Sequence, residues 1–397
     1  MATFLTGATG YLGSYLAARL LERGEALSVL VRATTRDEAS ARLWRAWQLH
    51  MDFDVFSRHL RELDVVLGDL TAPDLGLEPA ETARLARRID AVLHCAAALN
   101  RTSETACLQV NLKGTLSVLR LARRAEGDHG LRRFTHVSTV SVAGERQHET
   151  VGEDEALDWG RRDYDAYSRT KKFAEHMVRE LLPDVTRTIV RPSIVLGDSR
   201  SGRTTQFDMA RAFSVLASLP VLPLRPDDRI DIVPADWVAS AIATLHLDER
   251  PDHETYHLSA GEGSETYRAI TRELARSAAG RAPLFLPRLE RPFGRLAAGV
   301  ARRRLLGRVR SAARLIDVFY PYLTYDTVFD NSRVVARTGP PPAFSTYSTE
   351  LLRFVRRHRF TYPYVDWPGA PSPGREAPGA ARGGPAPADG MARGAAR

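Results

Sequence analysis

Short apolar runs alternate with longer amphipathic stretches over the first 195 residues. Six of these runs are rich in Val, Leu, Ile, Phe and Thr and predict β-strands at residues 3–7, 26–32, 63–69, 90–96, 133–138 and 186–193. Most intervals between them are long enough for a crossover helix, so the pattern predicts a doubly wound α/β fold, in which a parallel sheet carries helices on both faces. Residues 227–246 predict a further strand and helix and residues 254–262 another strand; the remainder is expected to be mostly helical and irregular.

The first predicted strand runs directly into a G-x-x-G-x-x-G turn that opens an amphipathic helix. Glycines in such a turn let backbone N–H groups approach a pyrophosphate at the helix N-terminus, where the helix dipole favours anions. Its position between a strand and a helix distinguishes a dinucleotide site from an ordinary tight turn. The residues expected to contact the dinucleotide are Gly7, Thr9, Gly10, Tyr11, Leu12 and Gly13.

The end of the second predicted strand indicates which dinucleotide binds. NAD sites usually place an Asp or Glu there, whereas an arginine accommodates the 2′-phosphate of NADP. This chain has Arg32 at that position, no carboxylate before Asp37, and Arg42 farther along. Guanidinium groups suit a phosphate, so NADPH is expected. The alternative, that these arginines are bystanders in an arginine-rich chain and that NADH binds, stays open.

Two more strand ends are expected to border the same cofactor, because ligands of such sheets lie beyond the carboxyl ends of the strands. Asp69 and Leu70 follow the third predicted strand and are placed to meet the adenine. Ala96, Ala97 and Ala98 follow the fourth strand, where small side chains let a dinucleotide lie close to the backbone.

The chain is expected to divide into three parts. Residues 1–195 form the predicted dinucleotide-binding domain, to which residues 230–260 return. Residues 196–368 are expected to form a smaller, mostly helical substrate-binding portion. Residues 369–397 are almost entirely Gly, Ala, Pro and Arg, which bury too little surface to offset the entropy of ordering. This tail is therefore predicted to be disordered.

With 397 residues, 44% of them hydrophobic and 26% charged, the composition is that of an ordinary soluble globular protein. Cys95 and Cys107 have neither metal-ligand nor disulfide spacing, so both are interpreted as packing residues in a reducing compartment, and no metal site is expected. The N-terminus lacks the basic region and apolar run of a secretory signal. No uncharged run approaches the ~20 apolar residues that span a bilayer, so a cytoplasmic protein is predicted.

The net charge of +8 is concentrated in one segment, residues 288–314, which holds nine arginines and one glutamate. Apolar residues recur there at helical spacing and predict a basic amphipathic helix. Two interpretations remain open. The helix has a solvated basic face, or it docks an anionic partner such as a coenzyme A phosphate, an acyl carrier protein acting in trans or a membrane surface. Nucleic acid is not expected, because no binding module accompanies the segment.

Lysine is rare in this chain, since only Lys113, Lys171 and Lys172 accompany 53 arginines. Lys171 follows Tyr167 by four residues, and side chains at that spacing share one face of a helix. An ordinary amphipathic helix with a surface lysine would explain the pair only by coincidence. The sequence therefore indicates that position 171 requires an ammonium group rather than a guanidinium.

Seven motifs occur in order within residues 2–270: TGATGYLG, GDL, HCAAALN, NLKGT, HVSTVSVAG, YSRTK and VRPSIVLG. Together they resemble the extended short-chain dehydrogenase/reductase family. Three further stretches, VLVRA…ARL before a long helical insertion, RPSIVLGDSRSG and RIDIVPADWVASAI, are similar in particular to the branch that contains fatty acyl-CoA reductases and thioester reductase domains. The residues that this resemblance implies for catalysis are Thr139 (or Ser141 in its place), Tyr167, Lys171 and Asn111. Those that it implies beside the nicotinamide and its ribose are Pro192, Ser193, Ile194 and Lys171.

The chemistry of carbonyl reduction accounts for these residue types. Hydride addition to a carbonyl makes an alkoxide, which needs a proton in or near the transition state. Tyr167 would supply it, because a nearby cation lowers the pKa of a phenol toward the working pH. The compact ammonium of Lys171 can bond the ribose beneath that phenol, a double task that a planar guanidinium fits badly. Thr139 would hold the substrate oxygen, and Asn111 would orient a water or a backbone group in the proton path.

The resemblance implies an NADPH-dependent reductase of an acyl thioester, bound to coenzyme A or a carrier protein, that forms an aldehyde and in some cases an alcohol. Apolar stretches at 209–224 and 315–329 would suit an acyl pocket, although most of their residues are expected to form core. Two other enzymes stay open: a ketone or alcohol oxidoreductase acting on a sterol-like or β-keto acyl substrate, and a nucleotide-sugar epimerase or dehydratase, against which Arg32 argues. A dinucleotide-sensing protein without activity is the non-enzyme alternative.

Overall fold

The computed structural model describes residues 2–99, 103–155, 157–277, 281–302, 320 and 322–368. Its central sheet has seven strands in the order β3-β2-β1-β4-β5-β7-β12, and every neighbouring pair is parallel. These strands are β1 (Ala2–Thr6), β2 (Leu27–Val31), β3 (Asp64–Leu67), β4 (Ile89–His94), β5 (Arg133–Val137), β7 (Arg187–Pro192) and β12 (Thr255–Leu258). The predicted doubly wound α/β fold is thus confirmed.

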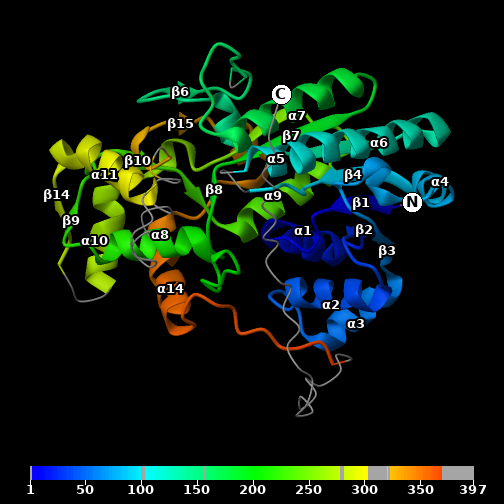
Figure 1. Cartoon of the computed structure of the whole chain (residues 1–397), viewed down its shortest axis with the longest axis horizontal. Helices are drawn as coiled ribbons and strands as arrows, with labels where there is room; N and C mark the ends of the chain where they lie inside the picture. The colour runs from blue at the N-terminus through cyan, green and yellow to red at the C-terminus, as the bar shows by residue number, and fades with distance from the viewer. Residues whose placement is uncertain are drawn as a thin grey trace, which may run out of the picture.

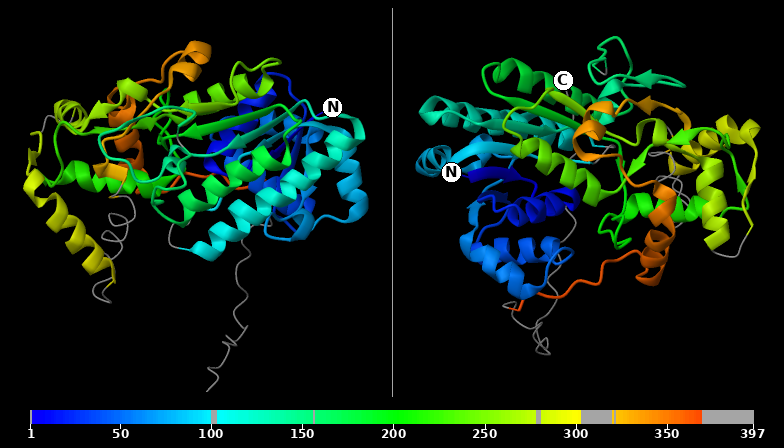
Figure 2. Two further views of the ribbon diagram at one scale, coloured as in Figure 1. Left: turned by 90° about the horizontal axis from the view of Figure 1, so that it is seen from above. Right: turned by 180° about the vertical axis from the view of Figure 1, so that it is seen from behind.

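Helices cover both faces of the sheet (Figures 1 and 2). One layer buries its apolar side chains against one face and consists of α1 (Tyr11–Glu22), α2 (Arg36–Trp47), α3 (Phe53–Glu62) and α9 (Ala235–Leu247). The layer on the other face contains η1 (Pro73–Gly76), α4 (Pro79–Arg88), α6 (Thr115–His129) and α7 (Ala166–Leu181). Strand order reverses on the two sides of β1, so the turn after β1 opens into the crevice where such sheets bind ligands.

A third apolar cluster lies beyond the sheet, at the left of Figure 1. Its main helices are α8 (Phe207–Ser218), α10 (Tyr267–Ser277) and α14 (Phe344–Arg357). Short strand pairs contribute to it: β8 (Ile194–Val195) with β11 (Ile232–Val233), β9 (Val221–Leu222) with β14 (Leu284–Phe285), and β10 (Arg229–Ile230) with β13 (Glu265–Thr266). The pair β6 (Thr150–Val151) with β15 (Val328–Phe329) belongs to a separate small cluster. The remaining elements are α5 (Glu104–Cys107), η2 (Leu108–Gly114), η3 (Val140–Ala143), η4 (Gly261–Gly263), η5 (Pro287–Leu289), α11 (Glu290–Arg302) and α13 (Ser332–Thr338).

Two late segments pack against the first helical layer. Val334 of α13 belongs to the same apolar cluster as α9. Trp367 lies with its ring 5.5 Å from that of Phe53 and 6.0 Å from that of Phe56, both in α3. The range 196–368 therefore contributes to the packing around the sheet as well as to the third cluster.

Two of the sequence predictions concern residues that lie outside the described ranges. These are the tail at 369–397 and the part of the basic stretch from residue 303 onward. The described part of that stretch ends with α11. None of the helices within the described ranges is long and apolar enough to cross a lipid bilayer.

Candidate active site

The glycine turn after β1 has no room for side chains. Gly7 has φ +80°, and a Cβ there would lie 2.8 Å from the backbone nitrogen of Ala96. A Cβ on Gly13 would lie 1.9 Å from the carbonyl oxygen of Gly7. The turn is held from behind by Trp47, which is fully buried and donates its indole N–H to the Ala8 carbonyl at 2.9 Å. This close approach of backbone to backbone is the geometry expected of a pyrophosphate cradle.

A cavity of about 970 Å³ opens in front of the turn and runs along the carboxyl ends of the strands. Most of the residues predicted for the site border it: Gly7, Thr9, Gly10, Tyr11, Leu12, Gly13, Arg32, Arg42, Asp69, Leu70, Ala96, Ala97, Ala98, Thr139, Tyr167, Pro192, Ser193 and Ile194. The structure thus brings together residues that are almost 190 positions apart, and the cavity is large enough for a dinucleotide and part of a substrate.

Two guanidinium groups mark the end of β2. Arg32 is exposed and borders the cavity with Arg42. Arg42 donates to the Arg32 carbonyl oxygen and lies 3.6 Å from the Glu38 carboxylate. Glu38 in turn accepts from the backbone and hydroxyl of Thr34. Positive charge therefore stands at the position where a ribose 2′ substituent is expected.

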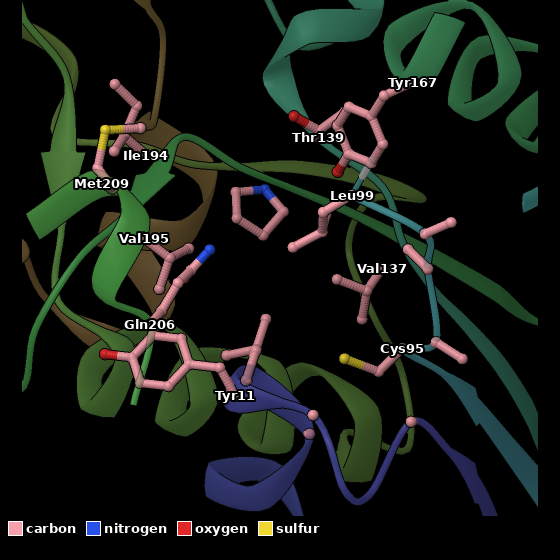
Figure 3. Close-up of a pocket in the computed structure, with 18 of the residues that line it drawn as sticks. Tyr11, Cys95, Leu99, Val137, Thr139, Tyr167, Ile194, Val195, Gln206 and Met209 are labelled. Atoms are coloured by element: carbon pink, nitrogen blue, oxygen red, sulfur yellow. The ribbon is translucent and has the colours of Figure 1, made fainter. Parts of the chain in front are cut away.

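The Thr139 and Tyr167 side chains lie on the same wall of the cavity, opposite Tyr11 and Gln206 (Figure 3). Thr139 Oγ1 is 3.2 Å from the Ser141 Oγ, and both residues border the cavity, so either hydroxyl can face a bound carbonyl. Tyr167 stands in the first turn of α7, whose N-terminus is capped by the Asp165 carboxylate at 2.8 Å from the Ser168 N–H. The cap fixes where α7 begins and hence where the phenol stands.

Lys171 lies one turn farther along α7, behind the cavity wall and 1% exposed. Its Nζ donates to the Val137 carbonyl at 2.6 Å and is 3.2 Å from His136 Nε2. Burial lowers the pKa of Lys171 to about 8, an effect opposed by the nearby Cys95 thiol and Glu175 carboxylate. The Lys171 side chain is therefore expected to lose its proton near pH 8.

Asn111 also lies behind the cavity wall, in the π-helical segment η2. Its side chain pairs with both backbone groups of Ala98, accepting from the N–H at 2.7 Å and donating to the carbonyl at 3.2 Å. It also donates to the Thr170 hydroxyl at 3.1 Å. Asn111 thus connects the cofactor-facing segment after β4 to the residue before Lys171. π-Helical turns often occur at functional sites.

Replacing Asn111 with alanine is expected to lower the free energy of unfolding by about 2 kcal/mol, because it removes two hydrogen bonds to the Ala98 backbone and one to the buried Thr170 hydroxyl. Urea denaturation would measure this change. Gln109→Ala, in the same segment, is a control that should stay within about 0.5 kcal/mol of the parent protein. Equal stabilities for the two variants would contradict the assigned contacts.

The two cysteines occupy different environments. Cys107 is buried. Cys95 packs against the core but also borders the cavity, and burial raises the pKa of its thiol to about 12. At neutral pH Cys95 is therefore a neutral thiol and a poor nucleophile.

At the other end of the cavity, the sequence predicted Ile194 and the two apolar stretches that contain Met209 and Phe329, but not Tyr164, Val195, Phe207 or Phe360. Tyr164 borders the cavity three residues before Tyr167, and its ring stacks on that of Tyr322 at 4.8 Å between centroids. The apolar lining there is Ile194, Val195, Phe207, Met209, Phe329 and Phe360. Within the two apolar stretches singled out earlier, Phe213, Leu222, Leu224 and Leu323 form core instead. Periodicity does not separate cavity-lining from core residues, because both are apolar.

Comparison with known proteins places this site among reductases. The sequence profile of the NAD-binding family described as male sterility protein matches residues 5–242. The chain is 30% identical over 259 residues to the L-2-aminoadipate reductase of Penicillium chrysogenum (its large subunit), a match that covers 60% of this chain and 18% of that protein. It is 31% identical over 285 residues to the carboxylic acid reductase of Mycobacterium tuberculosis, covering 64% of this chain and 24% of that protein.

Among solved structures, the terminal R domain from the myxalamid PKS-NRPS biosynthetic pathway superimposes with a TM-score of 0.76. It is 25% identical to this chain, and the match covers 90% of this chain and 91% of that domain. The chain spans about a quarter or less of the length of the curated relatives named above.

Proposed function

Because the chain belongs to the male sterility protein family of extended short-chain oxidoreductases, we propose that it reduces an acyl thioester to an aldehyde with NADPH. The family resemblance predicted from the motifs is thereby confirmed. The cofactor of the chain is a nicotinamide dinucleotide. The thioester, carried by coenzyme A or by a carrier protein in trans, is our proposal. It is supported by one observation above all: a single cavity joins the glycine turn, the Thr139 and Tyr167 hydroxyls and an apolar end.

Bound NADPH would supply hydride to the carbonyl carbon of the thioester. Thr139, or Ser141 beside it, would donate a hydrogen bond to the oxygen as negative charge develops there. Tyr167 would give that oxygen its proton. The resulting hemithioacetal would then collapse: its C–S bond breaks as the C=O bond re-forms, and the hydroxyl proton passes to the sulfur. The products are the free thiol and the aldehyde. Reduction of the aldehyde to an alcohol would repeat the same roles on the aldehyde carbonyl and would consume a second NADPH.

The remaining residues would hold the reactants. The turn at Gly7 and Gly13 would bind the pyrophosphate through backbone N–H groups, and Lys171 would bond the nicotinamide ribose. The apolar end around Phe207 and Met209 would receive the acyl chain. We further propose that residues 196–368 contain most of the substrate-binding surface, as their share of the cavity lining suggests.

The direct test is NADPH oxidation by the purified protein on acyl-CoA thioesters of increasing chain length and on the same acyl groups attached to a carrier protein. Mass spectrometry would identify the products. An aldehyde or alcohol formed in proportion to NADPH consumed is the expected result. Binding of NADPH without turnover of any thioester would overturn the proposal and direct attention to ketone and sterol-like substrates.

Cofactor choice gives a separate prediction. Arg32→Ala is expected to lower kcat/KM for NADPH by about 30-fold and to leave NADH nearly unaffected, since a charge-assisted contact to the 2′-phosphate contributes about 2 kcal/mol. Steady-state kinetics with both cofactors measures the ratio. Arg36→Ala is the control, because Arg36 lies at the start of α2, the helix that carries Arg42, and does not line the cavity. An unchanged NADPH-to-NADH ratio in Arg32→Ala would rule out Arg32 as the selecting residue.

A further inference from the structure

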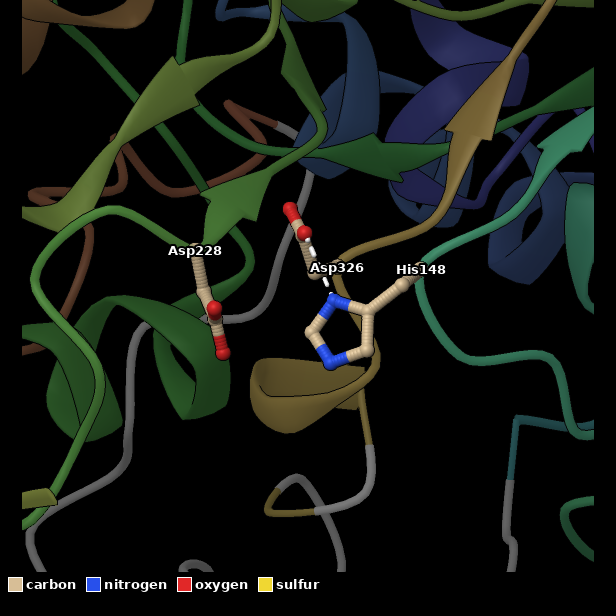
Figure 4. Close-up of side chains that lie close together, drawn as sticks. All are labelled: His148, Asp228 and Asp326. Atoms are coloured by element: carbon tan, nitrogen blue, oxygen red, sulfur yellow. Dashed lines mark hydrogen bonds and ion pairs between the residues drawn. The ribbon is translucent and has the colours of Figure 1, made fainter.

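Three potential metal ligands from distant parts of the sequence lie together beside the cavity (Figure 4). His148 precedes β6, Asp228 directly precedes β10, and Asp326 precedes β15. One ligand atom from each residue lies within 4.8 Å of the other two. His148 Nδ1 and Asp326 Oδ2 are 2.9 Å apart and share a hydrogen bond; two ligand atoms bound at about 2.1 Å to one tetrahedral ion lie about 3.4 Å apart, so a small outward movement of this pair would admit the ion.

Asp228 is the residue of this cluster that the fold alone does not explain. It is only 7% exposed, yet no hydrogen bond or ion pair to its carboxylate occurs within the described part of the chain. A buried carboxylate without a partner is costly, and this one adjoins a second carboxylate and an imidazole. Both features fit a site that binds a cation.

We propose that His148, Asp228 and Asp326 bind a divalent transition-metal cation, with Zn²⁺ the best match. One imidazole nitrogen and two carboxylate oxygens are ligands that Zn²⁺ accepts readily, with a fourth position left for water. Mg²⁺ and Ca²⁺ prefer a larger set made of oxygen ligands alone. The double negative charge of the two carboxylates matches the double positive charge of the ion.

The bound cation would join three segments that form one side of the cavity. Asp326 borders the cavity and also accepts from the Arg229 N–H at 2.8 Å. The backbone N–H of His148 donates to the Tyr325 carbonyl at 2.9 Å, so the loop before β6 already contacts the segment that carries Asp326. A metal bound to all three ligands would reinforce this wall. The glycine turn lies on other elements, so cofactor affinity should not depend on the metal.

The test uses the full chain, freed of any affinity tag and of metal by treatment with a chelator that is then removed. Calorimetric titration with Zn²⁺ alone should give one ion per chain. Asp228→Asn and His148→Ala should each weaken this binding by at least about tenfold. The matched controls are Asp227→Asn, whose carboxylate is exposed and pairs with Arg268, and His176→Ala, an exposed histidine on α7. Both should bind as the parent protein does.

Thermal unfolding supplies a second readout that needs no substrate. Its outcome therefore does not depend on whether the proposed reductase activity is correct. Zn²⁺ at about 100 times the parent Kd is expected to raise Tm by about 4 °C in the parent protein and in both controls, and by no more than about 2 °C in the two ligand variants. Asp228→Asn removes only the charge, and His148 is half exposed, so both variants are expected to fold. Absence of binding, or equal binding by all five proteins, would overturn the proposal.

Discussion

Replacing Tyr167 with phenylalanine is expected to lower kcat for thioester reduction by about 10²- to 10⁴-fold, the usual contribution of a positioned general acid. Tyr167 is 7% exposed and borders the cavity, so the change removes one hydroxyl from the cavity wall and little packing. Single-turnover reduction, followed by NADPH absorbance, would measure the chemical step. NADPH affinity is expected to stay within about threefold, because the glycine turn is untouched.

Tyr164→Phe is the matched control, since Tyr164 is also a cavity-lining phenol in the same stretch of chain. Its ring stacks on Tyr322, so its loss of a hydroxyl is expected to affect KM for the acyl substrate more than kcat. The assignment of Tyr167 as the proton donor is wrong if Tyr167→Phe keeps more than about a tenth of the parent kcat.

Lys171→Arg is expected to be nearly as damaging, lowering kcat/KM by about 10²- to 10³-fold although the charge is kept. Lys171 is enclosed by the Val137 carbonyl and His136, and a planar guanidinium fits neither that space nor a bond to the ribose. Steady-state kinetics and thermal unfolding of the variant separate lost catalysis from lost stability.

The adjacent residue provides the control. Lys172 is 2% exposed and pairs with the Asp163 carboxylate at 2.6 Å, a partner that arginine also binds. Lys172→Arg should therefore keep activity within about threefold of the parent. Similar kinetic losses in both variants would mean that any arginine in this buried helix face disrupts the fold. The result would contradict the assignment of Lys171 as the residue that bonds the ribose.

The pH profile tests the same residue without mutation. Because burial lowers the pKa of Lys171 to about 8, the cation is present below that pH and is lost above it. The contact that we propose between the ammonium and the ribose should weaken accordingly, so kcat/KM for NADPH, which reports the free enzyme, is expected to decline above about pH 8. A profile that stays flat to about pH 9.5 would contradict the buried environment of the ammonium.

Much of the cofactor side of the site was predictable because its signals are local. The turn at Gly7–Gly13 follows directly from glycine spacing between a strand and a helix, and the small residues at Ala96–Ala98 follow one strand end. The pair Tyr167 and Lys171 is four residues apart on one helix, so a single periodicity places both. In each case, neighbouring residues in the chain are neighbours in space.

The support for these residues was not predictable. Trp47 holds the glycine turn from a helix more than thirty residues away, and Asn111 pairs with the Ala98 backbone through a π-helical turn. An indole or an amide carries no sequence signal for the carbonyl or N–H group that it will bond. Cavity-lining Phe207 and core Phe213 are likewise both apolar residues of one helix, and only packing separates them.

By itself, the sequence determined the parallel sheet and the glycine turn after β1, because alternation and glycine spacing are properties of short segments. The residues for carbonyl reduction came from the family resemblance and stay a prediction. Only the tertiary structure decided which hydroxyls share a cavity, that Lys171 and Lys172 are both buried against different partners, and that His148, Asp228 and Asp326 lie together. Those contacts join residues up to about 180 positions apart, and their proximity depends on how all the layers pack.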